Sequence, residues 1–131
     1  MMSQYGWAAL ATLLALAVYF ASALMVGRAR GKYGVKAPAV TGDPGFERAF
    51  RAQQNMLEWM PLFLPALWLF ALTLSDRWAG ALGAIWALAR LGYVLSYAAA
   101  AERRGPWFGA QAAIFAVLWL GALVGAIKAI I

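Results

Sequence analysis

The sequence contains no cysteine and no histidine. These two absences exclude a disulfide framework, a thiolate nucleophile, a zinc finger, a histidine-ligated haem and a Ser-His-Asp triad. Charged residues are also scarce, at 12% of the chain, whereas an ordinary soluble domain carries about 25%. A disordered chain and a collagen-like repeat are excluded by the same composition.

Apolar side chains, in contrast, make up 65% of the 131 residues, and the mean hydropathy is +0.71. A soluble globule of this size would lack the polar side chains needed to cover its surface. Because about 20 apolar residues cross a bilayer as a helix, the chain has room for four spans with short connections. We therefore expect a single all-α membrane domain, residues 1–131, folded as a bundle of four transmembrane helices.

Four apolar stretches of sufficient length are separated by polar or helix-breaking residues. The first stretch carries no charge and contains Ala21-Ser22-Ala23, which resembles a signal-peptide cleavage site. A signal peptide also has a basic start and a shorter apolar core, and because this stretch has neither, a retained span is favoured. The four expected spans are residues 5–27, 45–74, 78–101 and 107–130.

The connections are marked by glycine, proline and polar residues. Residues 28–45 hold several glycines and are expected to form a loop rather than a helix. Within them, Asp43 is suited to cap the second helix, with Pro44 at the start of that helix. Residues 75–77 read as a tight polar turn, and Pro106 suits the start of the fourth helix.

The distribution of lysine and arginine predicts the orientation of the chain. The net charge is +6, and the basic residues gather in the first and third connections, which places these connections in the cytoplasm and both termini on the opposite side. No soluble basic domain is present, so we expect contacts with anionic lipid headgroups and none with nucleic acid. The basic residues at these connections are Arg28, Arg30, Lys32, Lys36, Arg48, Arg103 and Arg104, against Arg77 and Lys128 on the opposite side.

The most informative residues are polar side chains inside the expected spans. In the second span Arg51, Asn55 and Glu58 stand at i, i+4 and i+7, which puts them on one helix face. An ionised side chain in the middle of a span costs about 2.5–3.5 kcal/mol on the insertion scale. These three side chains are therefore expected to face protein, water or a ligand rather than lipid.

A second polar stripe lies on the third span. Arg90, Tyr93 and Tyr97 stand at i, i+3 and i+7, and Arg104 extends the stripe if the helix reaches it. Because the spans carry more arginine than glutamate, the surplus cations predict an anionic ligand held by arginine forks and oriented by amide and hydroxyl groups. The alternative is that these residues only tie helices together, for example through an ion pair between Glu58 and Arg90.

Three segments carry a resemblance to a known family. They are TGDPG at residues 41–45, FERAFRAQQNMLEWMPLFLPALW at residues 46–68, and ARLGYVLSY at residues 89–97, the last followed by Arg104. In these segments and in the order of its spans, the sequence resembles the MAPEG family, the membrane-associated proteins in eicosanoid and glutathione metabolism. It is most similar to the branch with leukotriene-C synthase and the microsomal glutathione transferases. The resemblance implies a homotrimer that holds glutathione, as co-substrate, between adjacent subunits near the cytoplasmic side.

The resemblance also implies roles for residues of the first two spans. Arg30 and Arg51 match family arginines that hold the carboxylates of glutathione, which suits their bidentate geometry. Asn55 and Glu58 match polar ligands on the second helix, where Glu58 accepts from the glutathione ammonium. Gln53 matches a further contact and, because it points off the stripe, could reach a neighbouring subunit.

The remaining roles concern the third span and the connection after it. Tyr93 and Tyr97 match family tyrosines that line the tripeptide, and Arg104 matches the arginine credited with activating the thiol. A guanidinium in a poorly hydrated site favours thiolate, the nucleophilic form, and it does so without transferring a proton. Arg30 is an alternative catalytic residue that would polarise the second substrate.

The sequence thus predicts a glutathione transferase or peroxidase that acts on hydrophobic electrophiles or lipid hydroperoxides arriving from the bilayer, without a metal. Two alternatives remain open. One is a non-catalytic lipid-binding scaffold of the same family, which would keep the fold without thiol activation. The other is a small four-span transporter, in which Glu58 would couple transport to protons.

Overall fold

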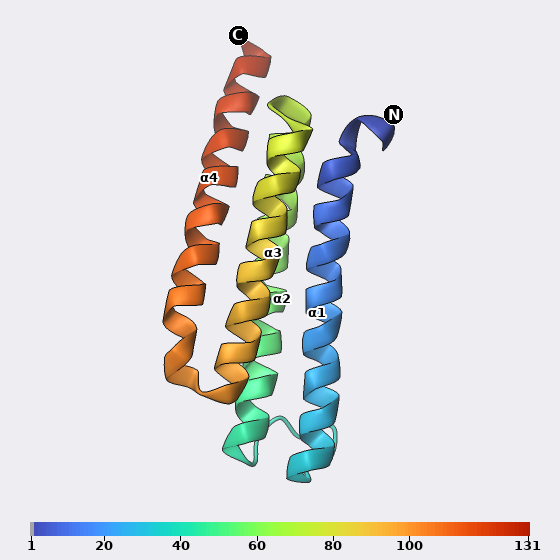
Figure 1. Ribbon diagram of the computed structural model, residues 1–131, viewed down its shortest axis with the longest axis vertical. Coiled ribbons are helices and arrows are strands. Elements are labelled where there is room, and N and C mark those ends of the chain that lie inside the picture. The colour runs from blue at the N-terminus through green and yellow to red at the C-terminus, as the bar shows by residue number, and fades with distance from the viewer. Residues whose placement is uncertain (1) are drawn as a thin grey trace.

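A computed structural model describes residues 2–131 as four long helices that lie side by side and alternate in direction (Figure 1). Each of the four is long and apolar enough to cross a membrane, which confirms the expected all-α fold with four candidate spans. Two short 3₁₀ turns, η1 (Met2–Tyr5) and η2 (Ala101–Arg104), precede the first and last helices. The long helices are α1 (Gly6–Tyr33), α2 (Pro44–Thr73), α3 (Asp76–Ala99) and α4 (Gly105–Ile130).

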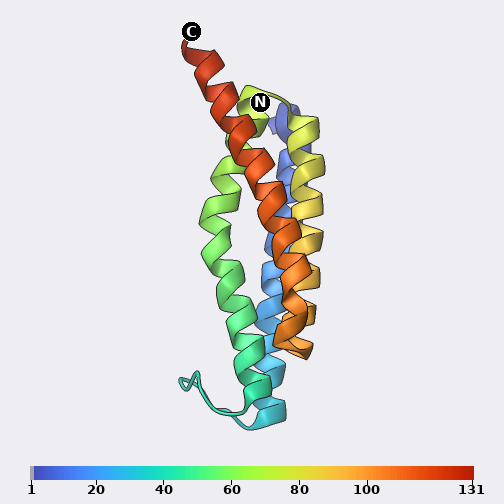
Figure 2. The ribbon, with the colours of Figure 1, turned by 90° about the vertical axis from the view of Figure 1, so that its left-hand side faces the viewer.

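The connections divide between the two ends of the bundle. Both termini and the α2–α3 turn lie at one end, whereas the α1–α2 and α3–α4 connections lie at the other (Figure 2). The two connections in which lysine and arginine gather are therefore at the same end. This arrangement puts Arg104, which ends η2, at the end of the bundle where α2 begins.

The start of α2 follows the expected capping chemistry. Asp43 is the N-cap, and its Oδ1 accepts a hydrogen bond of 2.7 Å from the backbone N–H of Gly45. Pro44 occupies the first helical position, where its missing N–H costs nothing. The expected cap at Asp43 is thus confirmed.

The expected loop over residues 28–45 is wrong in its first part, because α1 continues to Tyr33. A Cβ at Gly27 or Gly31 would meet only open space, so neither glycine marks a turn or a close approach. The helix stops at Gly34, whose φ of 70° is left-handed and whose N–H donates back to the carbonyl of Arg30. Arg30 therefore belongs to the last turn of a helix, where cations are favoured by the helix dipole.

The end of α3 lies close to the expected end of the third span at residue 101, so the helix does not reach Arg104. The helix ends at Ala99, and Ala100 is extended, with φ −161° and ψ 122°. The chain then forms η2 and enters α4 at Gly105. Arg104 consequently lies outside α3, and its position relative to the Arg90 stripe is set by the path of η2.

Side chains at the start of α3 cap the first turns of two helices, α3 itself and α1. Ser75 is the N-cap of α3 and accepts from the backbone N–H of Trp78 at 3.3 Å. Asp76 is not part of a free turn, since its carboxylate accepts from the backbone N–H groups of Trp7 and Ala8 at 3.0 and 2.8 Å. One acidic side chain thereby satisfies two of the four unpaired N–H groups at the start of α1.

The middle of the bundle is held by aromatic packing between α2, α3 and α4. Phe63 of α2 stacks on Trp86 of α3 with ring centroids 3.7 Å apart and planes at 7°. The indole N–H of Trp86 donates to Oε1 of Gln111 on α4 at 3.0 Å. A Cβ at Gly121 of α4 would collide with Phe70 of α2, so glycine permits the close approach of these helices. This packing fixes the spacing of α2 and α3, which carry the polar stripes, and holds α4 against them.

Candidate functional site

Arg90 lies at the centre of the polar stripes and is completely buried, with 0% of its surface exposed. Its Nη1 donates to Oδ1 of Asn55 at 2.9 Å, and its Nε donates to the sulfur of Met56 at 3.4 Å. The guanidinium carbon lies 4.4 Å from the ring centroid of Tyr93. The tie between the two helices therefore runs from Arg90 to Asn55, and not to Glu58.

Tyr93 continues the stripe from Arg90 to Tyr97 and Arg104. The rings of Tyr93 and Tyr97 meet edge to face, with centroids 5.7 Å apart, and Tyr93 is buried. The guanidinium carbon of Arg104 lies 4.9 Å from the ring centroid of Tyr97. Nη1 of Arg104 also donates to the carbonyl of Ala101 at 2.7 Å, a contact within η2. Four of the predicted site residues, Asn55, Tyr93, Tyr97 and Arg104, are thereby joined through Arg90.

An unbroken series of aromatic contacts leads away from these tyrosines. Tyr93 lies 6.1 Å from Phe108 of α4, and Phe108 lies 5.7 Å from Trp59 of α2, between ring centroids. Trp59 in turn meets Phe115 edge to face at 5.5 Å. Sequence reasoning missed this series, because the register of α4 against α2 is not encoded in either segment alone. The only available signal was a tryptophan directly after Glu58.

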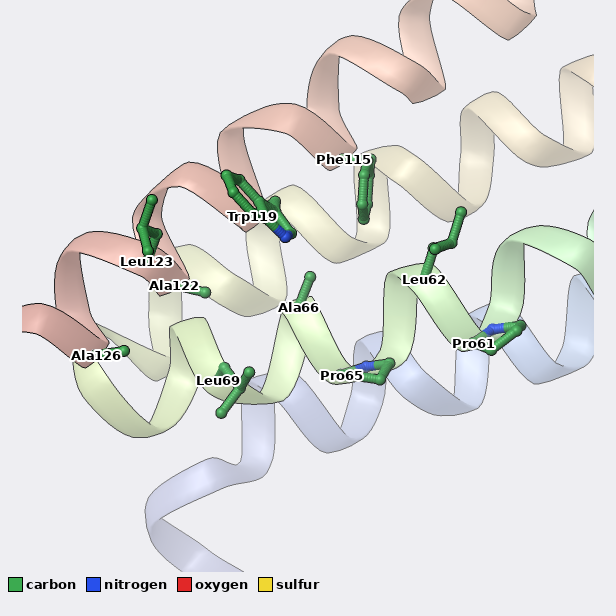
Figure 3. Close-up of a pocket in the computed structure, with 10 residues that line it drawn as sticks. All are labelled: Pro61, Leu62, Pro65, Ala66, Leu69, Phe115, Trp119, Ala122, Leu123 and Ala126. Atoms are coloured by element: carbon green, nitrogen blue, oxygen red, sulfur yellow. The ribbon is translucent and has the colours of Figure 1, made fainter.

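The series ends at an apolar groove of about 380 Å³ between α2 and α4. Phe115 and Trp119 of α4 project toward α2, where Ala66 faces them (Figure 3). Leu62 also lines the groove and, with Trp119, is exposed on the outer surface of the bundle. Where this surface faces lipid in a membrane, an apolar molecule could enter the groove without crossing water.

The other predicted residues of α2 are more exposed. Arg51 and Glu58 share the Asn55 face but are exposed, while Gln53 is half-buried. Arg51 also lines a small cavity of about 290 Å³, formed with the end of the α1–α2 connection. The fold therefore brings the α2 stripe beside the α3 stripe but leaves the two charged residues of the α2 stripe, Arg51 and Glu58, exposed.

Arg30 contacts the α1–α2 connection and the start of α2, and none of its contacts is with Arg104 or Tyr97. Its Nη1 donates to the carbonyls of Ala39 and Val35 at 2.8 and 3.4 Å. Its guanidinium carbon is 4.9 Å from the ring centroid of Phe46 at the start of α2. Arg30 thus holds the α1–α2 connection against the bundle, a structural role that the sequence did not reveal.

Comparison with known proteins agrees with the resemblance seen in the sequence, because residues 8–124 match the MAPEG family. An uncharacterised protein of Synechocystis sp. is 46% identical over 118 residues, 90% of this chain and 86% of that protein. Human microsomal glutathione S-transferase 2 is 45% identical over 106 residues, 80% of this chain and 71% of its own. Bovine leukotriene C4 synthase is 36% identical over 113 residues, 86% of this chain and 75% of its own. The match over residues 8–124 reaches into all four long helices.

Proposed function

The chain belongs to the MAPEG family, and from that premise we propose that it binds glutathione and activates the glutathione thiol for attack on hydrophobic electrophiles or lipid hydroperoxides. Similarity to a microsomal glutathione S-transferase and to a leukotriene C4 synthase supports this class of reaction. The observation that carries the proposal is the position of Arg104. Its guanidinium stacks on Tyr97, at one end of an aromatic series that reaches an apolar groove.

Arg104 has the chemistry that thiol activation needs. The pKa of a free thiol is about 8.5, so only a small share of the thiol is thiolate at neutral pH. A nearby guanidinium favours the anion, and arginine itself stays protonated, so the thiol proton is released to water. With a carbon electrophile the thiolate sulfur would form a bond to carbon while the bond to a leaving group, or the C–O bond of an epoxide, breaks and its electron pair leaves with the departing atom. With a lipid hydroperoxide the sulfur would bond to the distal oxygen as the O–O bond breaks and the alkoxide takes up a proton, and a second glutathione would convert the resulting sulfenic acid to the disulfide with release of water. The groove lined by Phe115 and Trp119 would hold the apolar part of that substrate.

The remaining residues would hold the tripeptide. Arg51 suits a carboxylate, Glu58 suits the ammonium group, and Asn55 suits a backbone oxygen of glutathione. The hydroxyls of Tyr93 and Tyr97 would line it from α3. Arg30 and Gln53 would complete the site, with Arg30 on a carboxylate or on the second substrate.

We propose that the site is shared between subunits of a homotrimer. Glu58 is exposed at the middle of α2, and an ionised side chain facing lipid at that depth costs about 2.5–3.5 kcal/mol. A neighbouring subunit covering this face would remove that cost. Arg30 contacts its own α1–α2 connection rather than the Arg104 group, so it would reach a glutathione on an adjoining subunit.

We further propose that the end of the bundle with both basic connections faces the cytoplasm, and that both termini lie on the opposite side. The gathering of lysine and arginine in these connections supports this orientation. Accessibility labelling of single cysteines, introduced into a chain that has none of its own, would test it.

The proposed function is tested with the purified protein in detergent or vesicles. Calorimetry should detect glutathione binding, and a chromophoric apolar electrophile should be conjugated by the protein faster than by glutathione alone. A lipid hydroperoxide should likewise be reduced at the expense of glutathione. Absence of glutathione binding would overturn the proposal and favour the non-catalytic scaffold. Binding without turnover of either substrate would overturn the catalytic part.

A further inference from the structure

We propose that Arg90 is a positioning residue of the glutathione site: it fixes the side-chain amide of Asn55 so that this amide turns its N–H donors toward the ligand. The inference rests on the proposed function, because it concerns the group that Asn55 presents to glutathione. Its basis is the hydrogen bond of 2.9 Å between Nη1 of Arg90 and Oδ1 of Asn55.

The direction of that hydrogen bond follows from chemistry. Arginine carries only donors, so the atom of Asn55 that faces it has to be the carbonyl oxygen Oδ1. The NH₂ group of Asn55 is then on the other branch of the amide, away from Arg90. Arg90 is fully buried whereas Asn55 is half-buried, and we infer that the NH₂ group is the part of the amide open to a ligand. A ligand that meets this NH₂ group supplies an acceptor, such as a carbonyl or carboxylate oxygen.

Arg90 is itself held firmly enough to impose this orientation. Its Nε donates to the sulfur of Met56, and its guanidinium lies against the rings of Tyr93 and Trp86, at 4.4 and 5.9 Å from the ring centroids. Trp86 is fixed in turn by its stack on Phe63. A side chain with partners on several sides has few alternative rotamers, so Asn55 meets a rigid donor.

The charge of Arg90 adds to the preference for an acceptor. Its partners are an amide oxygen, a thioether sulfur and aromatic faces, none of which is ionised. Nη2 of Arg90 is buried and has no hydrogen-bond partner within residues 2–131. The positive charge beneath Asn55 is thus not neutralised inside this part of the subunit. An anionic or strongly polarised oxygen at Asn55 would be favoured over a neutral donor.

A purely structural role for Arg90 is the competing explanation, since the Asn55 contact also ties α2 to α3. Both roles predict that loss of Arg90 lowers thermal stability, so stability alone does not distinguish them. The two roles differ in what happens when the contact is kept and the NH₂ group is removed. Asn55→Asp does this, because a carboxylate still accepts from Arg90 but offers no N–H to a ligand.

The first experiment therefore compares Asn55→Asp with the wild type. We expect the thermal midpoint to be kept or raised, and the glutathione Kd measured by calorimetry to rise at least tenfold. Arg28→Met, an exposed change on α1, serves as the control and should leave both values unchanged. A stable Asn55→Asp protein that binds glutathione as tightly as the wild type would overturn the inference.

The second experiment is a cycle with Arg90→Met, Asn55→Ala and the double variant, followed by steady-state kinetics. If Arg90 acts through Asn55, Arg90→Met should raise the KM for glutathione about tenfold with little change in kcat. In the Asn55→Ala background, Arg90→Met should change the KM for glutathione less than threefold. Arg90→Lys, which keeps a donor and the charge, should restore most of the affinity. Independent, additive effects would overturn the inference.

The two proposals fail in different ways. A wild-type protein that binds no glutathione overturns the proposed function and this inference together. A wild-type protein that binds glutathione, with a fully tolerated Asn55→Asp or an additive cycle, overturns only the role of Arg90.

Discussion

The guanidinium carbon of Arg104 lies 4.9 Å from the ring centroid of Tyr97, although the chain leaves the helix between the two residues. The extended Ala100 and the 3₁₀ turn after it fold the chain back. They bring the guanidinium of Arg104 over the ring of Tyr97, whereas a continuous helix would put the backbones of the two residues two turns, about 10 Å, apart. The break in the helix therefore brings Arg104, which lies outside α3, to the last tyrosine of the α3 stripe.

Replacement of Arg104 by alanine should lower kcat for conjugation about 10²-fold, which is typical when a group that stabilises developing charge is removed. The rate should also reach its plateau at a higher pH than in the wild type, because the guanidinium lowers the pKa of the bound thiol and its loss raises that pKa again. Arg103→Ala, an exposed neighbour in the same turn, is the matched control. Unchanged turnover and pH profile in Arg104→Ala would remove Arg104 from thiol activation.

The bundle was largely predictable because its signals are local. Four apolar stretches, a capping Asp43 and a helix-starting proline suffice to predict four helices and the start of α2. The end of α1 was not predictable in the same way, since Gly31 and Gly34 look alike in the sequence. Only Gly34 adopts the left-handed conformation that stops the helix.

The sequence predicts which helix face each site residue occupies, but not which residues of the two helices contact each other. The spacing of Asn55 and Arg90 assigns each residue to a helix face, and both faces do meet. Which residue of α2 lies opposite Arg90 depends on the register of the two helices, which is set by core packing such as that of Phe63 on Trp86. That is why Glu58, the partner of Arg90 in the alternative of a purely helix-tying role, is exposed while Asn55 forms the contact.

Asp76→Ala should destabilise the protein by about 1–2 kcal/mol, because two N–H groups at the start of α1 lose their acceptor. A lower midpoint of thermal unfolding in detergent is the expected observation, with glutathione affinity retained in the folded protein. Arg77→Ala changes the next residue, which is exposed, and should leave the midpoint in place. Equal midpoints for the two variants would contradict the capping role of Asp76.

Trp119→Ala should weaken binding of the apolar second substrate without changing the affinity for glutathione. Trp119 lines the α2–α4 groove and is 50% exposed, so its loss removes contact area without opening the core. An apolar contact of this kind is worth about 1–3 kcal/mol, which corresponds to a rise of about tenfold or more in the KM for a long-chain electrophile. Leu120→Ala, 55% exposed on the same helix but outside the groove, is the control. Identical KM values for Trp119→Ala and the wild type would exclude the groove as the substrate site.

Glu58→Gln distinguishes the proposed function from a proton-coupled transporter. If Glu58 accepts from the glutathione ammonium, the neutral amide should raise the glutathione Kd about tenfold or more, since a hydrogen bond to a charged group contributes about 1.5–3 kcal/mol. Glu58→Asp keeps the charge on a shorter side chain, so its glutathione Kd should lie between the values for the wild type and Glu58→Gln. Proton-coupled uptake into vesicles that disappears in Glu58→Gln, with no effect on glutathione binding, would support the transporter instead.

Arg30→Ala and Arg104→Ala chains, each with little activity alone, should together restore activity when they assemble into the same trimer. Arg30 contacts Ala39 and Phe46 in its own subunit, whereas Arg104 lies over Tyr97 at another part of the bundle. If each site takes Arg30 from one subunit and Arg104 from its neighbour, co-expressed Arg30→Ala and Arg104→Ala chains will form some sites with both arginines intact. Random mixing in a closed ring of three subunits gives about a quarter of such sites, and we expect a similar share of wild-type turnover. Mixing the two proteins after separate purification provides the control. Sites built within one subunit would never regain both arginines, so activity that stays at the level of the single variants would contradict a shared site.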